Sequence, residues 1–282
     1  MTAPVTKIKP VAKINQRRIS LTDVLVRPIV TMLAATVLLL VAWWLFLKLF
    51  NVNAFLGKTP ADAYKWLFND DDSAANRSQV FRDLRSTVRD AVPGLLAGTL
   101  VSLVVAVLFV SSPSAEQSFL PLAVGFRSVP ILVLVPLLGR IFGRGVIATT
   151  IVVSIIVFFP TLVIVTHGLR SVSRESVDLL RAYDASPSQV LWKLRLPTAL
   201  PSIFAAAKVA IPSAVIGAVL AEQFVIGRGL GYELIKARTK SEFSQMWTEV
   251  FLIAFLAILL YNVVAVIEQL VLAKYAPQQI ER

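Results

Sequence analysis

Polar side chains inside long apolar segments are the residues of this chain that could do chemistry. Four of them, together with one proline, stand out as candidates for a substrate pathway: Arg127, Ser128, Pro130, Glu222 and Gln223. Ionisable groups at bilayer depth are costly, and they mark solute pathways or paired structural sites. The chemistry that they predict is recognition of a passing solute, with no bond made or broken.

Each ionisable residue has a functional and a structural interpretation. Arg127 lies after an apolar run, where its guanidinium either meets an anion such as a sulfonate or nitrate, or joins two helices at the interface. Glu222 and Gln223 either line the exit of the pathway or anchor the loop that follows. Lys208 is expected to reach the interface with its long side chain, and Glu268 to mark the inner end of the last span.

The residues needed for catalysis or for a metal site are missing from the sequence. The chain has no cysteine and a single histidine, His167, at the end of an apolar run. It has no Ser-His-Asp set and no Gly-x-x-x-x-Gly-Lys-Ser/Thr loop for ATP. We therefore expect no catalytic residue, no metal and no cofactor in this chain, so that any ATP hydrolysis belongs to another polypeptide.

The elements that must position these residues are membrane helices. The chain is 56% hydrophobic and 16% charged, with a mean hydropathy of +0.74, whereas a soluble domain has about a quarter of its residues charged. Several apolar runs reach the roughly 20 residues that span a bilayer. The net charge of +11 comes from basic residues beside these runs. They predict contact with the lipid bilayer and its anionic headgroups, and no binding of nucleic acid.

Six apolar runs predict an all-α integral membrane protein with about six transmembrane helices. We expect a basic cytoplasmic tail over 1–27, a first transmembrane helix over 28–50, an extracytoplasmic segment over 51–90, and a second tail over 273–282. Between them lies a core of five transmembrane helices, 91–272, with spans at about 91–110, 119–141, 146–166, 202–225 and 250–272. Asp70 to Ser73 is expected to form a turn before a helix that runs into the second span.

The charge distribution predicts how the chain is oriented. Six lysines and arginines before residue 28 place the N-terminus in the cytoplasm, with the first helix retained and not cleaved as a signal peptide. An even number of spans then places the C-terminus and the loop 168–199 in the cytoplasm. The loop 226–249 departs from the rule, because it carries four basic residues and is expected outside.

The loop 168–199 interrupts the apolar pattern with two short amphipathic helices. The first, near 175–183, sets apolar positions against charged ones: Val177, Leu180 and Tyr183 against Glu175, Asp178 and Arg181. The second opens with Ser186-Pro187-Ser188-Gln189, which is typical of a capped helix start. Such a pair of helices either docks into a groove on a partner protein or lies on the headgroups.

The same stretch resembles the signature of binding-protein-dependent ABC transporter permeases, written EAA, three residues, G, nine residues, I, one residue, LP. The EAA position is Asp178-Leu179-Leu180, the glycine position is Asp184, the isoleucine position is Leu194, and LP is Leu196-Pro197. Flanking segments extend the match: 126–130, 172–175, 199–205, 217–222 and 227–232. Together they resemble the nitrate/sulfonate/taurine permease group over roughly residues 90–272.

The resemblance implies a type I ABC importer permease of a bacterial cell membrane. Two such subunits pair, as a homodimer or heterodimer, a solute-binding protein delivers the solute from outside, and two ATPase subunits bind ATP and Mg inside. The first helix of the loop then enters a cleft of the ATPase. The coupling residues implied are Glu175, Asp178, Leu179, Leu180, Arg181, Tyr183, Asp184, Leu194, Leu196 and Pro197.

The function implied is import of a small solute, such as a sulfonate, nitrate or similar anion. The alternative in the same group is a vitamin precursor, a pyrimidine or flavin, and the alternative of another class is a self-sufficient secondary transporter or channel. Two departures from the signature bear on coupling: Asp184 replaces the glycine, and Leu179-Leu180 replaces two alanines. The docking helix is then either tuned to a particular ATPase or part of the less engaged half of a heterodimer.

Overall fold

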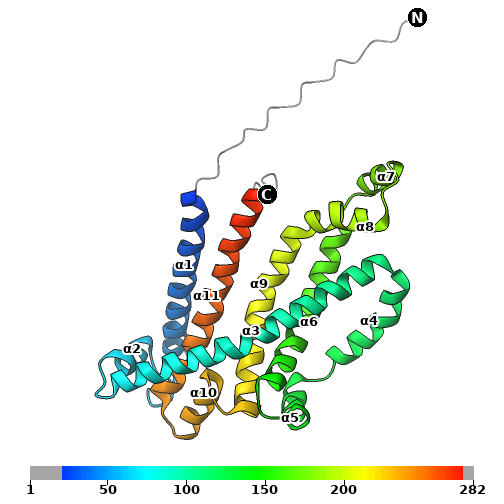
Figure 1. Cartoon of the computed structure of the whole chain (residues 1–282). Coiled ribbons are helices and arrows are strands. Elements are labelled where there is room, and N and C mark those ends of the chain that lie inside the picture. The colour runs from blue at the N-terminus through cyan, green and yellow to red at the C-terminus, as the bar shows by residue number, and fades with distance from the viewer. Residues whose placement is uncertain (1–20, 276–282) are drawn as a thin grey trace, which may run out of the picture.

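The computed structural model describes residues 21–275, which form helices joined by short loops, with no strand among them (Figure 1). Most of the predicted tail 1–27 lies outside these residues. So does the predicted tail 273–282, except for its first three residues. In order the elements are α1 (Leu21–Leu49), α2 (Pro60–Phe68), α3 (Ser73–Ser111), α4 (Pro113–Arg127), α5 (Ile131–Phe142), α6 (Val146–Arg170), α7 (Arg174–Ala182), α8 (Pro187–Val190), the π-helical turn η1 (Leu191–Arg195), α9 (Leu196–Ala221), a second π-helical turn η2 (Glu222–Ile226), α10 (Leu230–Thr239) and α11 (Phe243–Tyr275).

Five helical segments are long and apolar enough to cross a membrane, and they confirm the all-α membrane class. They are Pro28–Leu49, Ser73–Ser111, Val146–Arg170, Pro187–Ile226 and Phe243–Leu272. Four of them extend beyond the expected spans, and Ser73–Ser111 and Pro187–Ile226 do so by the greatest length. As predicted, a helix that begins at Ser73 runs directly into the second span. The prediction separates the second helix of the loop 168–199 from the fifth span, and this is wrong. In the structure α8, η1, α9 and η2 form one continuous helical segment.

The third predicted run is not a single helix, and this corrects the expected span 119–141. It divides into α4 and α5 around Ser128, Val129 and Pro130. Proline lacks a backbone N–H and disfavours helical geometry in the residue before it, so α4 ends before Pro130. Pro136, by contrast, is accommodated inside α5. Together the two helices lead the chain back across the molecule, from the end of α3 to the start of α6 (Figure 1).

The bundle has two distinct ends in Figure 1. The first residue of α1, the last turn of α11, α7 and α8 lie toward one end, which we call the α7 end. The elements α2, α5 and α10 lie toward the other, which we call the α10 end. The two ends of the described chain therefore share a side with the loop that carries α7, because α4 and α5 together return the chain from the end of α3 to the start of α6.

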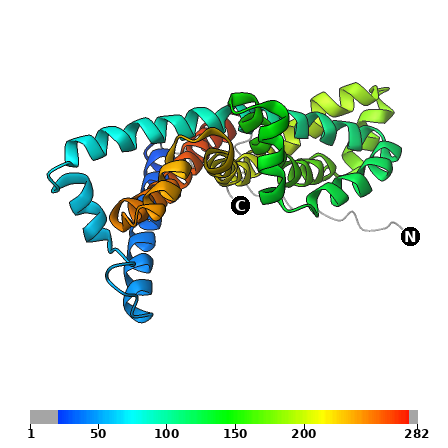
Figure 2. The same cartoon turned by 90° about the horizontal axis from the view of Figure 1, so that it is seen from below.

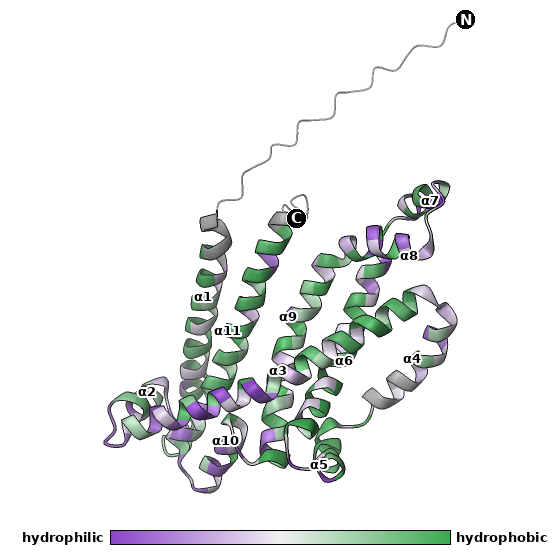
Figure 3. Ribbon diagram, in the orientation of Figure 1, coloured by the Kyte–Doolittle hydropathy of each residue, from purple (hydrophilic) through white to green (hydrophobic). Residues whose placement is uncertain are grey.

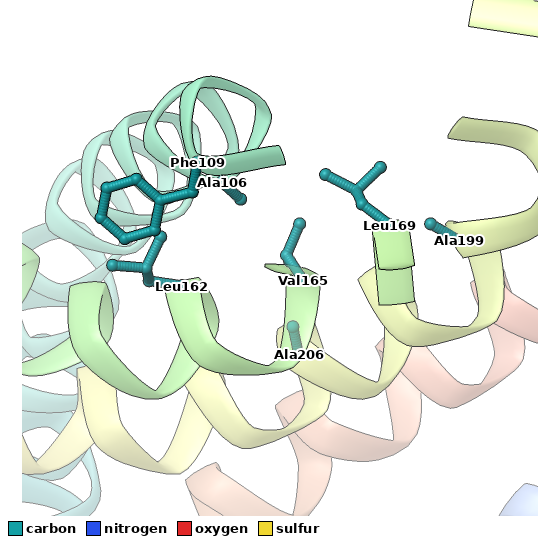
Figure 4. Close-up of a cluster of buried hydrophobic side chains, with 7 residues drawn as sticks. All are labelled: Ala106, Phe109, Leu162, Val165, Leu169, Ala199 and Ala206. Atoms are coloured by element: carbon teal, nitrogen blue, oxygen red, sulfur yellow. The ribbon is translucent and has the colours of Figure 1, made fainter. Parts of the chain in front are cut away.

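Small residues allow α3, α6 and α9 to pack closely at the centre. A Cβ atom added at Gly94 of α3 would come within 2.3 Å of the Val153 Cβ of α6, so that only glycine permits this approach. Toward the α7 end the same three helices bury a cluster that is shown in Figure 4: Ala106, Phe109, Leu162, Val165, Leu169, Ala199 and Ala206. This tight packing gives the loop between α6 and α8 a rigid base.

α1 is a peripheral helix. Seen from below, it projects away from the row of α3, α9 and α6 (Figure 2). Its main partner is α11, to which it is joined by stacking of Trp43 on Trp247, with ring centroids 5.4 Å apart. Hydropathy follows this plan, because apolar residues dominate the spans while polar residues gather on α7, α8, α10 and the first half of α3 (Figure 3).

Candidate functional site

α7 presents apolar side chains to the surroundings. Ser173 caps the helix, since its hydroxyl accepts a hydrogen bond from the Ser176 N–H at 3.2 Å. None of the nine residues of α7, all of them described, is buried. Leu179 is 60% exposed, and Tyr183, which follows the helix four residues later, is 79% exposed. Leu180 is half-buried. An exposed apolar pair at this spacing forms one continuous contact surface.

The turn after α7 places Asp184 in a left-handed conformation, with φ +55°. Its N–H donates to the Arg181 carbonyl at 2.9 Å, and the Ala185 N–H donates to the Leu180 carbonyl at 3.1 Å. This position corresponds to the signature glycine, and the structure shows why glycine suits it. Aspartate is one of the few other residues that tolerate positive φ.

The second part of the loop folds as the sequence predicts. The Ser186 hydroxyl accepts from the Gln189 N–H at 3.3 Å, and the Gln189 side chain accepts from the Ser186 N–H at 2.8 Å, so the capping box is confirmed. The chain then passes through η1, which contains Leu194, into α9, which opens with Leu196 and Pro197. Both leucines are half-buried against the bundle.

Polar contacts support this end of the bundle. The Arg195 guanidinium donates to the Leu169 carbonyl of α6 at 3.4 Å. Arg170, the last residue of α6, forms an ion pair with Glu116 of α4, in which its Nη1 donates to Oε1 at 3.0 Å. The pKa of the Glu175 carboxyl lies below its usual value, because the carboxyl accepts hydrogen bonds from the Glu175 backbone N–H and from the Ser173 side chain. His167 is exposed in the last turn of α6.

The predicted pathway residues fall into two groups in the structure. Arg127 ends α4, and its side chain lies outside the described part; Ser128 and Pro130 are exposed in the link to α5. Glu222 and Gln223 open η2 at the end of α9. α5 connects the two groups because it packs against η2, where a Cβ at Gly139 would come within 2.9 Å of Val225.

Glu222 is fully buried, and its Oε2 accepts a hydrogen bond from the Gly231 N–H at 2.8 Å. A side chain without exposed surface does not line an open path in this conformation. The geometry therefore supports the second interpretation of Glu222, as the anchor of the loop that follows α9. Gln223 is half-buried.

A polar face of α3 completes this anchor and is absent from the sequence prediction. The Thr87 hydroxyl accepts from the Leu230 N–H at 3.1 Å, and Asp90 pairs with Arg228 at 3.3 Å. Gln79 donates to Glu233 at 2.8 Å. The signal in the sequence is the spacing of the polar residues along one helical face, Gln79, Asp83, Thr87 and Asp90.

Lys208, expected to reach the interface, and Glu268, expected to mark the inner end of the last span, form an ion pair with each other. The Lys208 Nζ of α9 lies 2.6 Å from the Glu268 Oε2 of α11. Their side chains are 23% and 15% exposed. In the described part of the chain, no three His, Asp or Glu side chains are arranged to hold a metal ion.

Comparison with known proteins identifies the family. The family described as "Binding-protein-dependent transport system inner membrane component" matches residues 94–275, more than half of the chain. The chain is an ABC transporter permease of this family. This confirms the resemblance drawn from the signature, whose expected extent was roughly 90–272. α1, α2 and the first half of α3 precede the matched range.

Relatives with assigned roles are also permeases. A probable ABC transporter permease protein of Haemophilus influenzae is 28% identical, over 79% of this chain and 89% of the relative. The formylaminopyrimidine transport permease protein of Halalkalibacterium halodurans is 26% identical, over 70% of this chain and 79% of the relative. The taurine transport system permease protein of Escherichia coli is 24% identical, over 78% and 80%. The permease is thus a multi-pass membrane subunit of an ATP-driven transporter, not a self-sufficient transporter or channel.

Proposed function

We propose that this permease forms the translocation path of a bacterial importer, with its α7 end in the cytoplasm. In this arrangement α7 docks on an ATPase subunit that holds ATP and Mg. A second permease subunit, identical or different, completes the path, and a solute-binding protein delivers the solute at the α10 end. Both chain termini are then cytoplasmic.

The observation that carries the proposal is the exposed apolar face of α7. Leu179 of α7 and Tyr183, directly after the helix, are exposed, and α7 buries none of its own nine residues. Burying one leucine contributes about 1.5 to 3 kcal/mol. The headgroup alternative is less favoured, because α7 stands at the tip of the molecule beyond the ends of the spans (Figure 1). Membership in a family of ABC permeases also supports a protein partner.

The continuity of the helix after α7 supports mechanical coupling. The turn at Asp184 leads into α8, η1 and α9 without a break in the helical run Pro187–Ile226. A displacement of α7 by the ATPase would therefore pass directly into a central membrane helix. Rigid-body movement of this kind needs no covalent chemistry in the permease.

Thiol labelling tests the orientation, because the chain has no cysteine of its own. Asp184→Cys should be protected from an impermeant thiol reagent in intact cells, whereas Asp71→Cys and Lys240→Cys should be labelled. Permeabilised cells serve as the control for accessibility of position 184. Labelling of Asp184→Cys from outside would overturn both the orientation and the docking of α7 on a cytoplasmic ATPase.

For the solute, we propose a small anion such as a sulfonate or nitrate, with Arg127 as its contact. Relatives that transport taurine and aliphatic sulfonates support this class. Arg127→Lys should weaken uptake of radiolabelled taurine, because a point charge replaces a planar guanidinium. Arg127→Ala should abolish uptake while the complex still assembles. Normal uptake by Arg127→Ala, or failure to assemble, would assign Arg127 a structural role.

A vitamin precursor is the second candidate, and two relatives favour it. One is named for formylaminopyrimidine transport, and another, from Chloroflexus aurantiacus, for riboflavin transport at 29% identity over 55% of this chain. Uptake of labelled formylaminopyrimidine or riboflavin, compared with uptake of labelled taurine by the same cells, separates the two classes. Uptake of one of the former, together with poor uptake of taurine, would favour the second candidate.

A further inference from the structure

One ion pair joins α9 to α11 in the described part of the chain. The Lys208 Nζ and the Glu268 Oε2 lie 2.6 Å apart, within segments that the hydropathy assigns to the membrane. Both side chains are largely covered. Neither water nor lipid tails can readily replace a lost partner in such surroundings, so separating the pair is far more costly than separating an exposed pair.

The position of the pair along α9 gives it a mechanical consequence. Lys208 lies between the π-helical turns η1 and η2, which end the regular α-helix on either side. π-helical turns are places where a helix departs from its regular hydrogen bonding, and they are often found at functional sites. Between them α9 carries Pro201 and Pro212 and packs on α11, and within the described residues the Lys208–Glu268 pair is the one salt bridge that joins the two helices.

Beyond α11 the connection continues to the periphery of the molecule. Trp247 of α11 stacks on Trp43 of α1, and the Trp247 indole N–H donates to the Leu56 carbonyl at 2.8 Å. α11 therefore carries the peripheral helix α1 and the loop before α2. A contact that holds α9 against α11 therefore also decides whether α1 and the loop before α2, which we call the outer layer, move when α9 moves.

We propose that Lys208 and Glu268 are positioning residues that make α11, and α1 with it, move together with α9 when the ATPase acts on α7. The proposal rests on the proposed function for the driving step at α7. The pair itself takes no part in contacting the solute or ATP. Without it, α9 would move alone, and part of the displacement would be lost before it reached the outer layer.

Distance measurements on the assembled complex in nanodiscs test the proposal. Spin labels replace Ile216 of α9 and Val263 of α11, which are both exposed and both several residues from the ion pair. The partner proteins are cysteine-free, so that only these two positions carry labels. Labelled permease subunits are diluted with unlabelled ones. With wild-type Lys208 and Glu268, the distance distribution should be the same with and without Mg-ATP. With Lys208→Glu or Glu268→Lys, it should broaden or shift by about 2 Å or more, a typical helix displacement. The exchange Lys208→Glu/Glu268→Lys should restore the narrow distribution.

The chain offers a matched control in the pair Lys240 and Glu242, which is about half exposed at a separation of 4.0 Å. Lys240→Glu reverses the same kind of charge at a site where it should leave the distribution unchanged. If a reversal at 208 or 268 prevents assembly, Lys208→Gln and Glu268→Gln give the same comparison with a smaller perturbation. An unchanged distribution in the single variants, or a wild-type distance that shifts with Mg-ATP, would overturn the proposal.

Copurification of the ATPase with the wild-type permease separates failure of this inference from failure of the proposed function. Suppose that the ATPase is retained, but the single variants leave the distance distribution unchanged or the wild-type distance shifts with Mg-ATP. Then only the proposed linkage of α9 to α11 is wrong. If no ATPase is retained, the proposed function fails, and the comparison without nucleotide still decides whether the pair holds the two helices together.

Discussion

The α7 end and the α10 end of the permease handle their polar and apolar residues in opposite ways. At the α7 end, apolar side chains such as Leu179 and Tyr183 are exposed, and charged residues surround them. At the α10 end, charged and polar residues such as Glu222 and Thr87 are buried, and backbone N–H groups of the first two residues of α10 donate to them. One end leaves its apolar surface open, while the other buries polar groups and satisfies part of them: the Glu222 Oε2 accepts from the Gly231 N–H, whereas the Glu222 Oε1 and the Asp90 Oδ2 have no hydrogen-bond partner in the described part of the chain.

This difference indicates where free energy is available for association. Exposed apolar area gains stability only when a partner covers it. A buried carboxylate that accepts a backbone hydrogen bond stabilises its own fold, and replacing it leaves an unsatisfied donor. Substitutions at the α7 end should therefore affect assembly and leave folding intact, whereas substitutions at the α10 end should affect folding first.

The largest expected effect comes from Leu179→Asp/Leu180→Asp. It removes up to two apolar contacts of about 1.5 to 3 kcal/mol each and brings charge into an interface, where an unpaired group costs several kcal/mol more. Docking of the ATPase should weaken by several orders of magnitude, at about 1.4 kcal/mol per tenfold. The measurement is copurification of the ATPase together with its rate of ATP hydrolysis.

Tyr64→Asp is the matched control for that experiment, because Tyr64 is 59% exposed on α2 at the opposite end. It should leave the ATPase bound. The single variants sharpen the result, since Leu179 is exposed and Leu180 is half-buried. Leu179→Asp should account for most of the loss. Retention of the ATPase by the double variant would show that α7 is not the docking element.

An intermediate effect is expected at the α10 end from Gly229→Ala. Gly229 has φ +91°, and an added Cβ would come within 2.2 Å of the Glu222 Oε1. Backbone strain of this kind costs about 1 to 3 kcal/mol, and the clash with the buried carboxylate adds to it. We expect a lower midpoint of thermal unfolding in nanodiscs, with the ATPase still bound to the folded fraction.

Gly227→Ala isolates the contribution of the contact with Glu222. Gly227 also has positive φ, at +76°, but an added Cβ would meet only Tyr232 at 3.8 Å. Its cost should be the left-handed conformation alone, about 1 to 2 kcal/mol. Equal losses of stability in the two variants would mean that the buried Glu222 carboxylate does not constrain this loop.

The smallest effect is expected from Asp184→Gly in the turn after α7. Because Asp184 has φ +55°, glycine should relieve about 1 kcal/mol of strain or less. ATP hydrolysis by the complex should be unchanged or slightly faster. Asp184→Val, with a β-branched side chain at the same φ, should reduce retention of the ATPase. A loss of coupling in Asp184→Gly would show that the aspartate side chain itself contacts the ATPase.

Hydropathy and local motifs predicted the membrane class, the permease family and part of the loop structure, because these features depend on residues that are neighbours in the sequence. Apolar runs of membrane-spanning length indicated the all-α membrane class, and the spacing from Asp178 to Pro197 indicated the permease family. The capping box at Ser186 and the left-handed turn at Asp184 are likewise local features. A break at a proline is a local feature too, and the structure shows one at Pro130, which disfavours helical geometry in the residue before it, but none at Pro136.

Only the tertiary structure decided which distant residues meet. Lys208 and Glu268 lie on different spans, and their pairing depends on how α9 and α11 rotate and pack. The same holds for Thr87, whose hydroxyl accepts from the backbone of Leu230 far along the chain. The average hydropathy of a segment reports whether it enters the membrane, but it does not distinguish one face of the helix from another. The direction in which a polar side chain points is set by packing between helices, and that is information a single sequence does not hold.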